Sequence, residues 1–261
     1  MKLLGIVNIT PDSFSNDGLA NKEPIDFAIK LIKDGAHILD IGAESTRPGA
    51  TPLTANEEWQ RLEKTLSTII NIAKESDIKT SLDTRYPENA LRAIALGIDW
   101  INDVSGFTNL EMIKVLGKNN AAVLMHNLGV PADKNNIIDI NLDPVEEVLS
   151  WGEKQINNLL EAGIEKNNII FDPGIGFGKN SQQSLKLVRR IKEFKKLGVK
   201  ILVGHSRKSF LGEITGNEAA NRDVETIISS LYLADNGVDY VRVHNILGHV
   251  NALKIRDNLW K

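Results

Sequence analysis

Polar and charged residues recur in this sequence at the points where short apolar runs end. Asp172 begins the segment DPGIGFGK, Gly204 begins GHSRKSFLG, and His244 lies near the end of VRVHN. An apolar run that stops at a polar or glycine-rich loop is typical of a buried parallel strand. Three such segments in one chain predict that their side chains share a pocket, as they would in an enzyme.

Further candidates are located by their spacing from glycines that are expected to end helices. Asp40, Asn102 and Arg242 each follow such a glycine by five residues. The full set of strand-end candidates is Asn8, Asp40, Asp83, Asn102, Asp172, Lys208, Arg242 and His244. Carboxylates and amides can bind the edge of a flat heterocycle, and Arg, Lys and His can bind phosphate. Asp and Asn also cap helices and begin turns, which would explain any one of them, but eight at equivalent positions favour a site.

Eight apolar segments predict the strands that would position these residues. They are Leu3–Ile9, Ile38–Gly42, Lys79–Asp83, Trp100–Val104, Ala122–His126, Ile169–Asp172, Lys200–Val203 and Tyr240–His244. Helical patterns between and after them include Ile25–Asp34, Asn56–Lys74, Pro144–Leu160, Ser184–Lys196, Asp223–Ala234 and His249–Asn258. The glycines expected at helix ends are Gly35, Gly97, Gly163, Gly198 and Gly237. Eight such units predict a single (β/α)8 TIM barrel with its site at the carboxyl ends of the strands, and a doubly wound sheet is the alternative.

Composition limits the class of protein. The 261 residues are 42% hydrophobic and 25% charged, with a formal net charge of −3 and no cysteine. This is ordinary for one globular domain, expected over residues 1–261, and no positive charge favours a nucleic acid partner. We expect no membrane partner and no signal peptide, because no apolar run approaches the roughly 18 residues of a membrane span. The lack of cysteine excludes disulfides and thiolate metal sites and suits a cytoplasmic location.

Seven segments resemble, in the right order, the signature motifs of dihydropteroate synthases. They are NITPDSFS (8–15), GAESTRPG (42–49), SLDT (81–84), INDVSG (101–106), DPGIGFGK (172–179), GHSRKSFLG (204–212) and VRVHN (241–245). Together they span nearly the whole chain. The resemblance implies a barrel enzyme of folate biosynthesis that joins 6-hydroxymethyl-7,8-dihydropterin diphosphate to 4-aminobenzoate and releases pyrophosphate.

The resemblance also implies which residues bind the pterin. Asp83, Asn102 and Asp172 match the positions that accept hydrogen bonds from the amino and N–H groups of the ring. Lys208 would donate to the ring acceptors. Arg242 would lie across the face of the ring and touch phosphate.

The resemblance also implies residues for the diphosphate and for 4-aminobenzoate. His244 and Arg242 would bind the diphosphate, and Asn8 would lie near an Mg²⁺ cofactor that bridges phosphate oxygens. Asp40 belongs to the same pocket. The residues implied for the remaining substrate wall are Thr46, Pro48, Phe177, Lys208 and Ser209. Those implied in catalysis are Asp12, Asp17, Arg47, Lys208, Arg242 and His244.

The implied chemistry requires no strong base, because an aniline nitrogen is already nucleophilic. The electron-rich dihydropterin would allow the C–O bond to break before the amine attacks, so stabilising the departing pyrophosphate matters most. A homodimer formed through late helices is also implied. The apolar residues of the helix expected at 223–234 would serve either the core or that interface, and they are Ile227, Ile228, Leu231 and Leu233.

Four positions depart from the family pattern. Ala43, Ser184 and Asn245 replace a usual glycine, asparagine and aspartate. In the first loop Asn16 stands where an acid is usual, and Asp17 follows it. Asp17 therefore either takes the place of the usual acid or is only a solvent-exposed residue of a turn.

Other functions remain open from sequence. A pterin-binding methyltransferase that serves a corrinoid protein would share the Asp and Asn positions but has no need of GAESTRPG or SRKS. A non-catalytic pterin-binding homologue would be expected to lose loop residues first, and only Asn16 hints at that. No HExxH or Walker pattern is present, and Lys208 as a Schiff-base lysine fits its neighbours less well than anion binding does. His37 and His249 are expected at the surface or at a helix edge.

Overall fold

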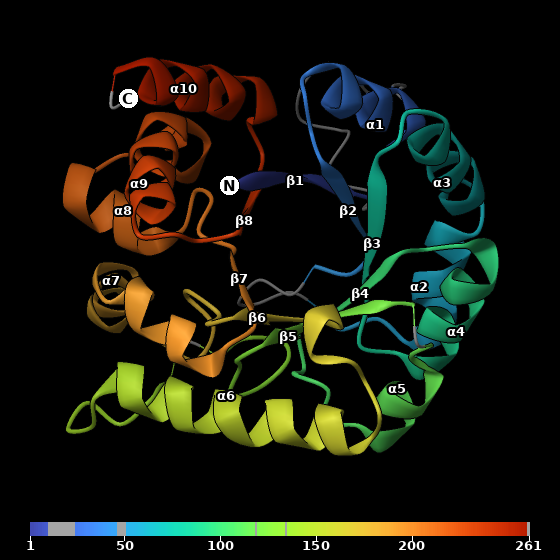
Figure 1. Ribbon diagram of the computed structural model, residues 1–261, viewed down its shortest axis with the longest axis horizontal. Coiled ribbons are helices and arrows are strands. Elements are labelled where there is room, and N and C mark those ends of the chain that lie inside the picture. Colours follow the sequence, from blue (N-terminus) through green and yellow to red (C-terminus); the bar gives the residue numbers. More distant parts are fainter. Residues whose placement is uncertain (10–23, 46–50, 118, 134, 260–261) are drawn as a thin grey trace.

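Eight parallel strands close into a barrel in the order in which they occur in the sequence (Figure 1). The structure is a computed structural model that describes residues 1–9, 24–45, 51–117, 119–133 and 135–259. The strands are β1 Lys2–Asn8, β2 Ile38–Gly42, β3 Lys79–Asp83, β4 Trp100–Asp103, β5 Ala121–Met125, β6 Ile169–Asp172, β7 Lys200–Val203 and β8 Tyr240–Val243. Because β8 pairs with β1, the predicted (β/α)8 barrel is confirmed and the open doubly wound sheet is excluded.

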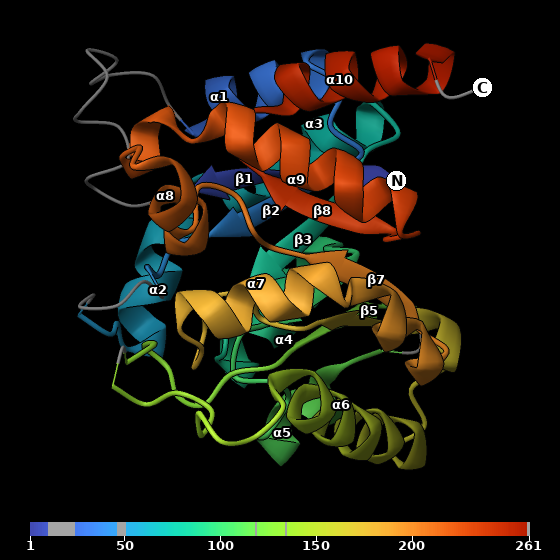
Figure 2. The same cartoon turned by 90° about the vertical axis from the view of Figure 1, so that its left-hand side faces the viewer.

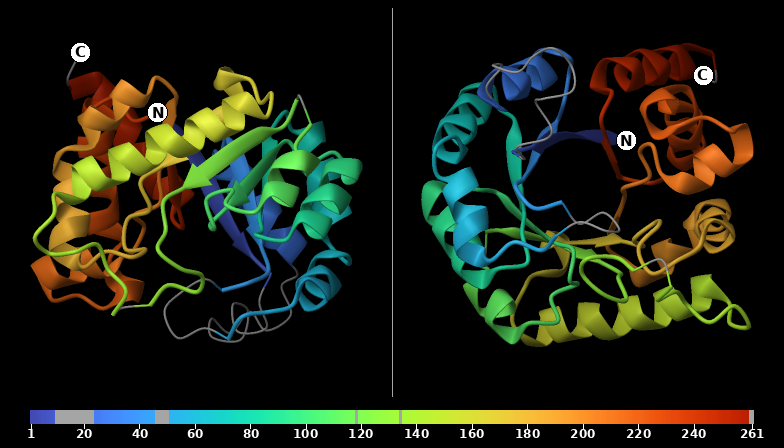
Figure 3. Two further views of the ribbon diagram at one scale, coloured as in Figure 1. Left: turned by 90° about the horizontal axis from the view of Figure 1, so that it is seen from below. Right: turned by 180° about the vertical axis from the view of Figure 1, so that it is seen from behind.

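Helices surround the barrel on its outside, as the views from below and behind show (Figure 3). The α-helices are α1 Pro24–Lys33, α2 Ala55–Leu62, α3 Leu66–Glu75, α4 Pro87–Leu96, α5 Leu110–Val115, α6 Pro144–Glu161, α7 Ser181–Arg189, α8 Ser209–Thr215, α9 Asp223–Asp235 and α10 Ile246–Leu259. Short 3₁₀ helices are η1 Lys166–Asn168, η2 Ile191–Leu197 and η3 Ala219–Asn221. In a second view α9 and α10 run side by side along one flank (Figure 2).

Helix boundaries differ from the sequence prediction at three places, one of which is the last helix, because it begins at Ile246 and not at His249. The helix expected over 56–74 is two helices, because the backbone of Thr65 (φ −129°) leaves the helical region between α2 and α3. The helix expected over 184–196 is instead α7 followed by the 3₁₀ helix η2. Helix α7 begins at Ser181, since Asn180 and Gln183 form a capping box there. All five glycines expected at helix ends have positive φ, as the left-handed cap conformation requires.

An apolar plug fills the lower half of the barrel interior. Side chains alternate along each strand, so every second residue points inward. Inside, the ring of Trp100 meets that of Tyr240 edge to face, with 5.1 Å between their centroids. The residues of the plug are Leu4, Ile38, Trp100, Ala121, Val123, Ile170, Leu202 and Tyr240. A separate, larger core lies between the strands and the surrounding helices, so the barrel is a rigid support for whatever its strand ends carry.

Candidate active site

Polar side chains form a layer directly above the apolar plug, at the carboxyl ends of the strands. A residue two positions after a plug residue points into the same interior, because side chains alternate along a strand. On β2, β4, β6 and β8 these residues are Asp40, Asn102, Asp172 and Arg242. The closed barrel therefore brings together residues that the sequence places far apart, at the end of the fold where barrel enzymes hold their substrates.

Arg242 is the centre of a buried ion cluster in this layer. Its Nε donates to Asp40, which is completely buried, and its Nη2 donates to Oδ2 of Asp83 at 3.0 Å. The amide of Asn102 lies 3.4 Å from Asp40. Burial acts against the charge of Arg242, but Asp40 and Asp83 outweigh it and raise the pKa of the guanidinium. The geometry thus gives Asp40 the role of a fully buried counter-ion that fixes Arg242, whereas the side chain of Asp83 is still 12% exposed.

Burial also acts on two carboxyl groups of this layer. It raises the pKa of Asp83, while the guanidinium of Arg242 opposes that rise. It raises the pKa of Asp172 as well, and there the opposing groups are the N–H of Gly174 and the ammonium of Lys208. Each carboxylate thus depends on nearby donors to remain ionised.

The loops after β6 and β7 form the second wall of the site. The N–H of Gly174 donates to Oδ1 of Asp172 at 2.7 Å. Lys208 donates from Nζ to the carbonyl of Ile175, and the same Nζ lies 3.8 Å from the ring centroid of Phe177. Asp172, Lys208 and Phe177 are therefore brought together, as the sequence predicted. Ser209 is exposed at the first residue of α8.

His244 and Asn8 complete the described part of the candidate site. His244 follows β8, and its Nδ1 lies 2.8 Å from the hydroxyl of Ser206. Asn8 is the last residue of β1, is partly exposed, and lies opposite Gly42 in the strand register. The predicted residues Asp12, Asp17, Thr46, Arg47 and Pro48 lie outside the described residues, so their roles stay predictions.

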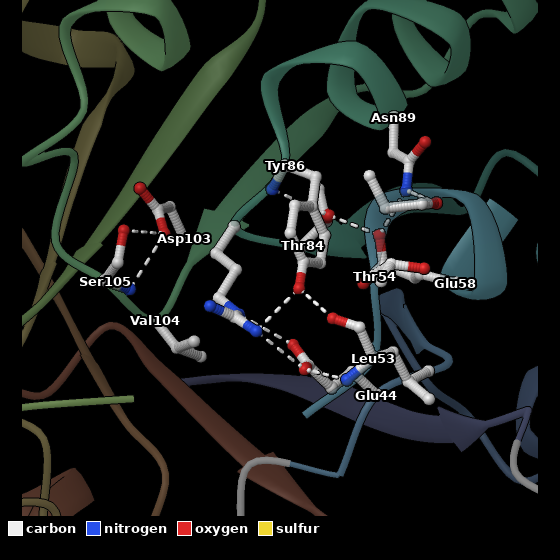
Figure 4. A network of polar contacts seen from close by, with 12 residues as sticks. Glu44, Leu53, Thr54, Glu58, Thr84, Tyr86, Asn89, Asp103, Val104 and Ser105 are labelled. Carbon is white, nitrogen blue, oxygen red and sulfur yellow. Dashed lines mark hydrogen bonds and ion pairs between the residues drawn. The ribbon is translucent and has the colours of Figure 1, made fainter. Parts of the chain in front are cut away.

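A clasp of polar contacts that the sequence did not predict holds both flanks of residues 46–50 (Figure 4). Arg85 pairs with Glu44 through two hydrogen bonds, of 2.9 and 3.0 Å. Glu44 also accepts from the N–H of Leu53 at 2.8 Å, and the hydroxyl of Tyr86 donates to the carbonyl of Leu53. The end of β3 therefore anchors the chain before and after that segment.

Glu58 is buried beside this clasp, although it lies on a highly polar helix (Figure 4). Its Oε2 accepts from Thr84 Oγ1 at 2.6 Å and from Asn89 Nδ2 at 2.7 Å. Its Oε1 has no hydrogen-bond partner among the described residues. Burial raises the pKa of Glu58 to about 7, against these two hydrogen bonds. The burial of Glu58 follows from its contacts with Thr84, after β3, and with Asn89, on α4. Helical periodicity in the sequence therefore could not predict that it is buried.

The expectation that His249 lies at the surface or at a helix edge is wrong. Its side chain is buried between α9 and α10, where Nε2 lies 3.0 Å from the hydroxyl of Ser230. Nε2 of His205 lies at the same distance from that hydroxyl. Burial lowers the pKa of both imidazoles, so they are neutral parts of the packing. His37 is exposed, as expected.

Two of the departures from the family pattern fit their surroundings. Ser184 accepts a hydrogen bond from the N–H of Gly176 at 3.2 Å, and so supports the glycine-rich loop from α7. Asn245 donates to Asp223 at 3.1 Å and caps the N–H of Gly248. Neither substitution disturbs the polar layer.

A closed parallel barrel with a buried layer of acids, amide and guanidinium at its strand ends defines a class of barrel enzymes that bind a polar, planar ligand. The family model described as "Pterin binding enzyme" matches residues 4–244, so the chain belongs to the pterin-binding enzymes. Within that family it falls among the dihydropteroate synthases, which are transferases of folate biosynthesis.

Similarity extends over nearly the full chain. The dihydropteroate synthase of Synechocystis sp. is 38% identical over 99% of this chain and 90% of its own. The type-3 enzyme of Escherichia coli is 35% identical, with 97% of each covered. The structure of dihydropteroate synthase from Anaplasma phagocytophilum with bound 6-hydroxymethylpterin-monophosphate superimposes with a TM-score of 0.90 at 34% identity, covering 99% of both chains. That of Xanthomonas albilineans with 4-aminobenzoic acid gives 0.89 at 32%, covering 99% of this chain and 93% of that one.

Proposed function

We propose that the pocket at the carboxyl ends of the strands condenses 6-hydroxymethyl-7,8-dihydropterin diphosphate with 4-aminobenzoate, and that it forms 7,8-dihydropteroate and pyrophosphate. The observation that carries this proposal is the buried layer that holds Asp83, Asn102, Asp172 and Arg242 at the strand ends. Solved relatives with pterin phosphate and with 4-aminobenzoate support the assignment of both substrates.

The pterin binds through the two carboxylates and the amide. Its ring carries an amino group and N–H groups that need acceptors, and its carbonyl and ring nitrogens need donors. Asp172 and Asp83 supply acceptors, and Asn102 can supply both. Lys208 supplies a donor at the opposite wall. A buried site built to satisfy each polar atom rejects a ligand that would leave one unpaired.

The diphosphate lies toward β1 and β8, where Asn8, His244 and Arg242 are placed. No group of three His, Cys, Asp or Glu side chains in the described part of the chain could hold a metal ion. The amide oxygen of Asn8 alone still fits Mg²⁺, since this ion commonly takes one or two protein ligands and the rest from phosphates and water. When bound, Mg²⁺ would neutralise charge on the leaving diphosphate. Ser206 fixes the ring of His244 through its hydrogen bond and so sets which nitrogen faces the diphosphate.

Bond breaking precedes amine attack in the mechanism that we propose. The site contributes donors aimed at the departing pyrophosphate, and it contributes carboxylates near the cation that develops on the pterin. Positional isotope exchange within the diphosphate would reveal reversible C–O cleavage. A displacement that shows no exchange under any condition and requires the amine for cleavage would contradict this order of events.

Release of pyrophosphate, measured with both substrates and Mg²⁺, tests the proposed function. Product is expected only when 4-aminobenzoate is present, and sulfonamides, which resemble it, should inhibit competitively. No product at saturating substrates would favour a non-catalytic pterin-binding protein. Methyl transfer to a corrinoid protein would favour the methyltransferase alternative instead.

Asp172→Asn should weaken binding of the pterin more than it slows turnover. The amide places a donor where the ring also donates, and such a buried mismatch costs about 1–2 kcal/mol, or roughly 5- to 30-fold in Kd. Calorimetry with the pterin measures the change. The N–H of Gly174 can still donate to the amide oxygen, so the loop should keep its place. Unchanged affinity would remove Asp172 from the pterin site.

Asp17→Asn tests whether this residue replaces the acid that is usual at position 16. We propose that Asp17 stabilises positive charge as it develops on the pterin, so kcat should fall severalfold more than KM rises. Gly18 beside it can re-aim the backbone with little conformational cost. Asn16→Asp is the matched variant. If Asp17→Asn leaves turnover intact while Asn16→Asp raises it, the replacement idea is wrong.

A homodimer formed through α9 and α10 is proposed on the basis of an exposed apolar surface. Val224, Ile228 and Tyr232 follow one another at helical spacing on α9, with 67%, 62% and 42% of their surfaces exposed. Leu247 and Ile255 are also exposed on the adjacent α10. Of the apolar set that the sequence suggested for either core or interface, Leu233 is buried in the core, Ile227 and Leu231 are partly buried, and Ile228 faces outward.

Ile228→Glu should convert the dimer to a monomer, because it places a charge in an apolar interface. Light scattering at micromolar concentration should give twice the chain mass for the wild type and the single chain mass for the variant. Ile140→Glu, at another exposed isoleucine, is the control and should remain dimeric. A wild-type chain of single mass would exclude the dimer.

A cytoplasmic location is also proposed. The chain has no cysteine, which suits a reducing compartment. In the described residues no helix has the length and apolar character needed to cross a membrane. Fractionation of cells that express the chain would place it.

A further inference from the structure

Lys179 is buried behind the glycine-rich loop, outside the set of residues assigned to the substrates. Only 6% of its surface is exposed. Its Nζ lies 2.8 Å from Nδ1 of His126, 3.0 Å from the carbonyl of Gly174 and 2.7 Å from the carbonyl of Phe177. A buried lysine with three neighbouring acceptors and no carboxylate among them requires an explanation.

The three acceptors match the three N–H bonds of an ammonium group. Neither carbonyl can donate, and burial lowers the pKa of His126 to about 2, so its imidazole is neutral and can accept at Nδ1. Burial lowers the pKa of Lys179 well below its usual value, whereas the carboxylate of Asp172 opposes that effect. A neutral amine would fit the same contacts only if His126 carried its proton on Nδ1 and donated it to the amine lone pair. The nearby carboxylate of Asp172 favours the ammonium form, in which the His126 proton is on Nε2.

The ammonium contacts hold the loop on which two candidate site residues depend. The backbone of Gly174 contacts both Asp172 and Lys179. Its N–H donates to Asp172, and its carbonyl accepts from Lys179. Phe177, whose carbonyl binds Lys179, presents its ring to Lys208. Gly174 has a φ of +65°, and a Cβ there would lie 1.9 Å from the carbonyl of His126, so the loop packs directly on the end of β5.

The geometry points to Lys179 as a positioning residue whose buried ammonium fixes the glycine-rich loop, and thereby sets Asp172 against the pterin and Phe177 against the neighbouring wall. This inference rests on the proposed function, because it assigns the loop to the pterin pocket. Lys179 does not itself touch substrate. Its loss should therefore change affinity more than the rate of the chemical step.

Lys179→Met tests this role, with Lys186→Met as the matched control. Lys186 is a half-exposed lysine on α7 whose ammonium lies 3.3 Å from Asp143. The KM and Kd for the pterin should rise about 10- to 100-fold in Lys179→Met, with kcat changed less than about threefold. The control should match the wild type. Unchanged constants in a folded Lys179→Met protein would overturn the inference.

Two further measurements keep the inference testable if Lys179→Met does not fold. Nitrogen NMR of labelled histidines in the wild type should show His126 protonated at Nε2 with a hydrogen-bonded Nδ1, and a proton on Nδ1 would overturn the ammonium assignment. His126→Phe identifies the signal and keeps the contact with Trp151. Because it removes only one of three acceptors, it should raise the pterin KM about 3- to 10-fold; no rise would also overturn the inference. If the wild type bound no pterin, the proposed function would fail, while the NMR result would still stand.

Discussion

Arg242→Met should lower the free energy of unfolding by about 3–5 kcal/mol, because it removes the counter-charge from buried carboxylates. Asp40 is fully buried, and the side chain of Asp83 is only 12% exposed. Without the guanidinium both would be left without their ion-pair partner. Urea unfolding at neutral pH measures the change, and kcat/KM should fall as well, since we propose that Arg242 contacts both pterin and diphosphate.

Control variants separate this effect from simple loss of an arginine. Arg256→Met removes the same side chain from an ion pair with the exposed Asp235, where about 0–1 kcal/mol is expected. Arg242→Lys keeps the charge but loses the fork that reaches two carboxylates, so it should be intermediate. Adding Asp40→Asn to Arg242→Met should recover part of the lost stability. If Arg242→Met lowered the free energy of unfolding as little as Arg256→Met, the cluster would not be a coupled ion pair.

Most of the fold could be predicted from the sequence because parallel strands are marked by local patterns. The apolar runs gave each strand to within one residue at either end. The rule that barrel sites lie at strand ends then placed Asp172 and Arg242 in one layer. That step needs only the alternation of side chains and the closure of the sheet, and neither depends on the details of packing.

Contacts within the layer could not be predicted, because they join residues far apart in the chain. Arg242 and Asp40 are 202 residues apart, and no pattern in the sequence pairs them. The strand register decides that Asp40 is fully buried beside the guanidinium, while the side chain of Asp83 stays 12% exposed. The sequence identified both acids as candidate site residues. It could not show that Asp40 is a buried counter-ion, while Asp83 is the acid that we propose contacts the substrate.

The burial of Lys179 and Glu58 also could not be predicted from the sequence. Charged residues in a helix or loop are ordinarily placed in solvent, because burying a charge is unfavourable. Lys179 is buried because two carbonyls and an imidazole converge on it. Glu58 is buried because Thr84 and Asn89 supply donors from neighbouring elements. Such exceptions become visible only when every element is in place.

Glu58 should make the protein less stable as pH rises through the neutral range. Its pKa is raised from the usual 4.5 to about 7 in the folded state, so the folded protein binds this proton more tightly than the unfolded chain does. Its contribution to stability is therefore complete below about pH 4.5 and is lost as pH rises toward and through 7. For a shift of this size the loss between pH 5 and pH 8 is about 2–3 kcal/mol.

Glu58→Gln isolates this contribution, because the amide cannot ionise but its oxygen can accept from both Thr84 and Asn89. The difference in unfolding free energy between variant and wild type, measured by urea at pH 5 and pH 8, should move by about 2–3 kcal/mol in favour of the variant. Glu57→Gln, on the same helix, is the control. Hydrogen bonds from Thr54 lower the pKa of Glu57, so most of its titration lies below pH 5 and that difference should change little. A constant difference for Glu58→Gln as well would mean that Glu58 is ionised in the folded protein throughout this range, and that the contacts with Thr84 and Asn89 are enough to hold its charge.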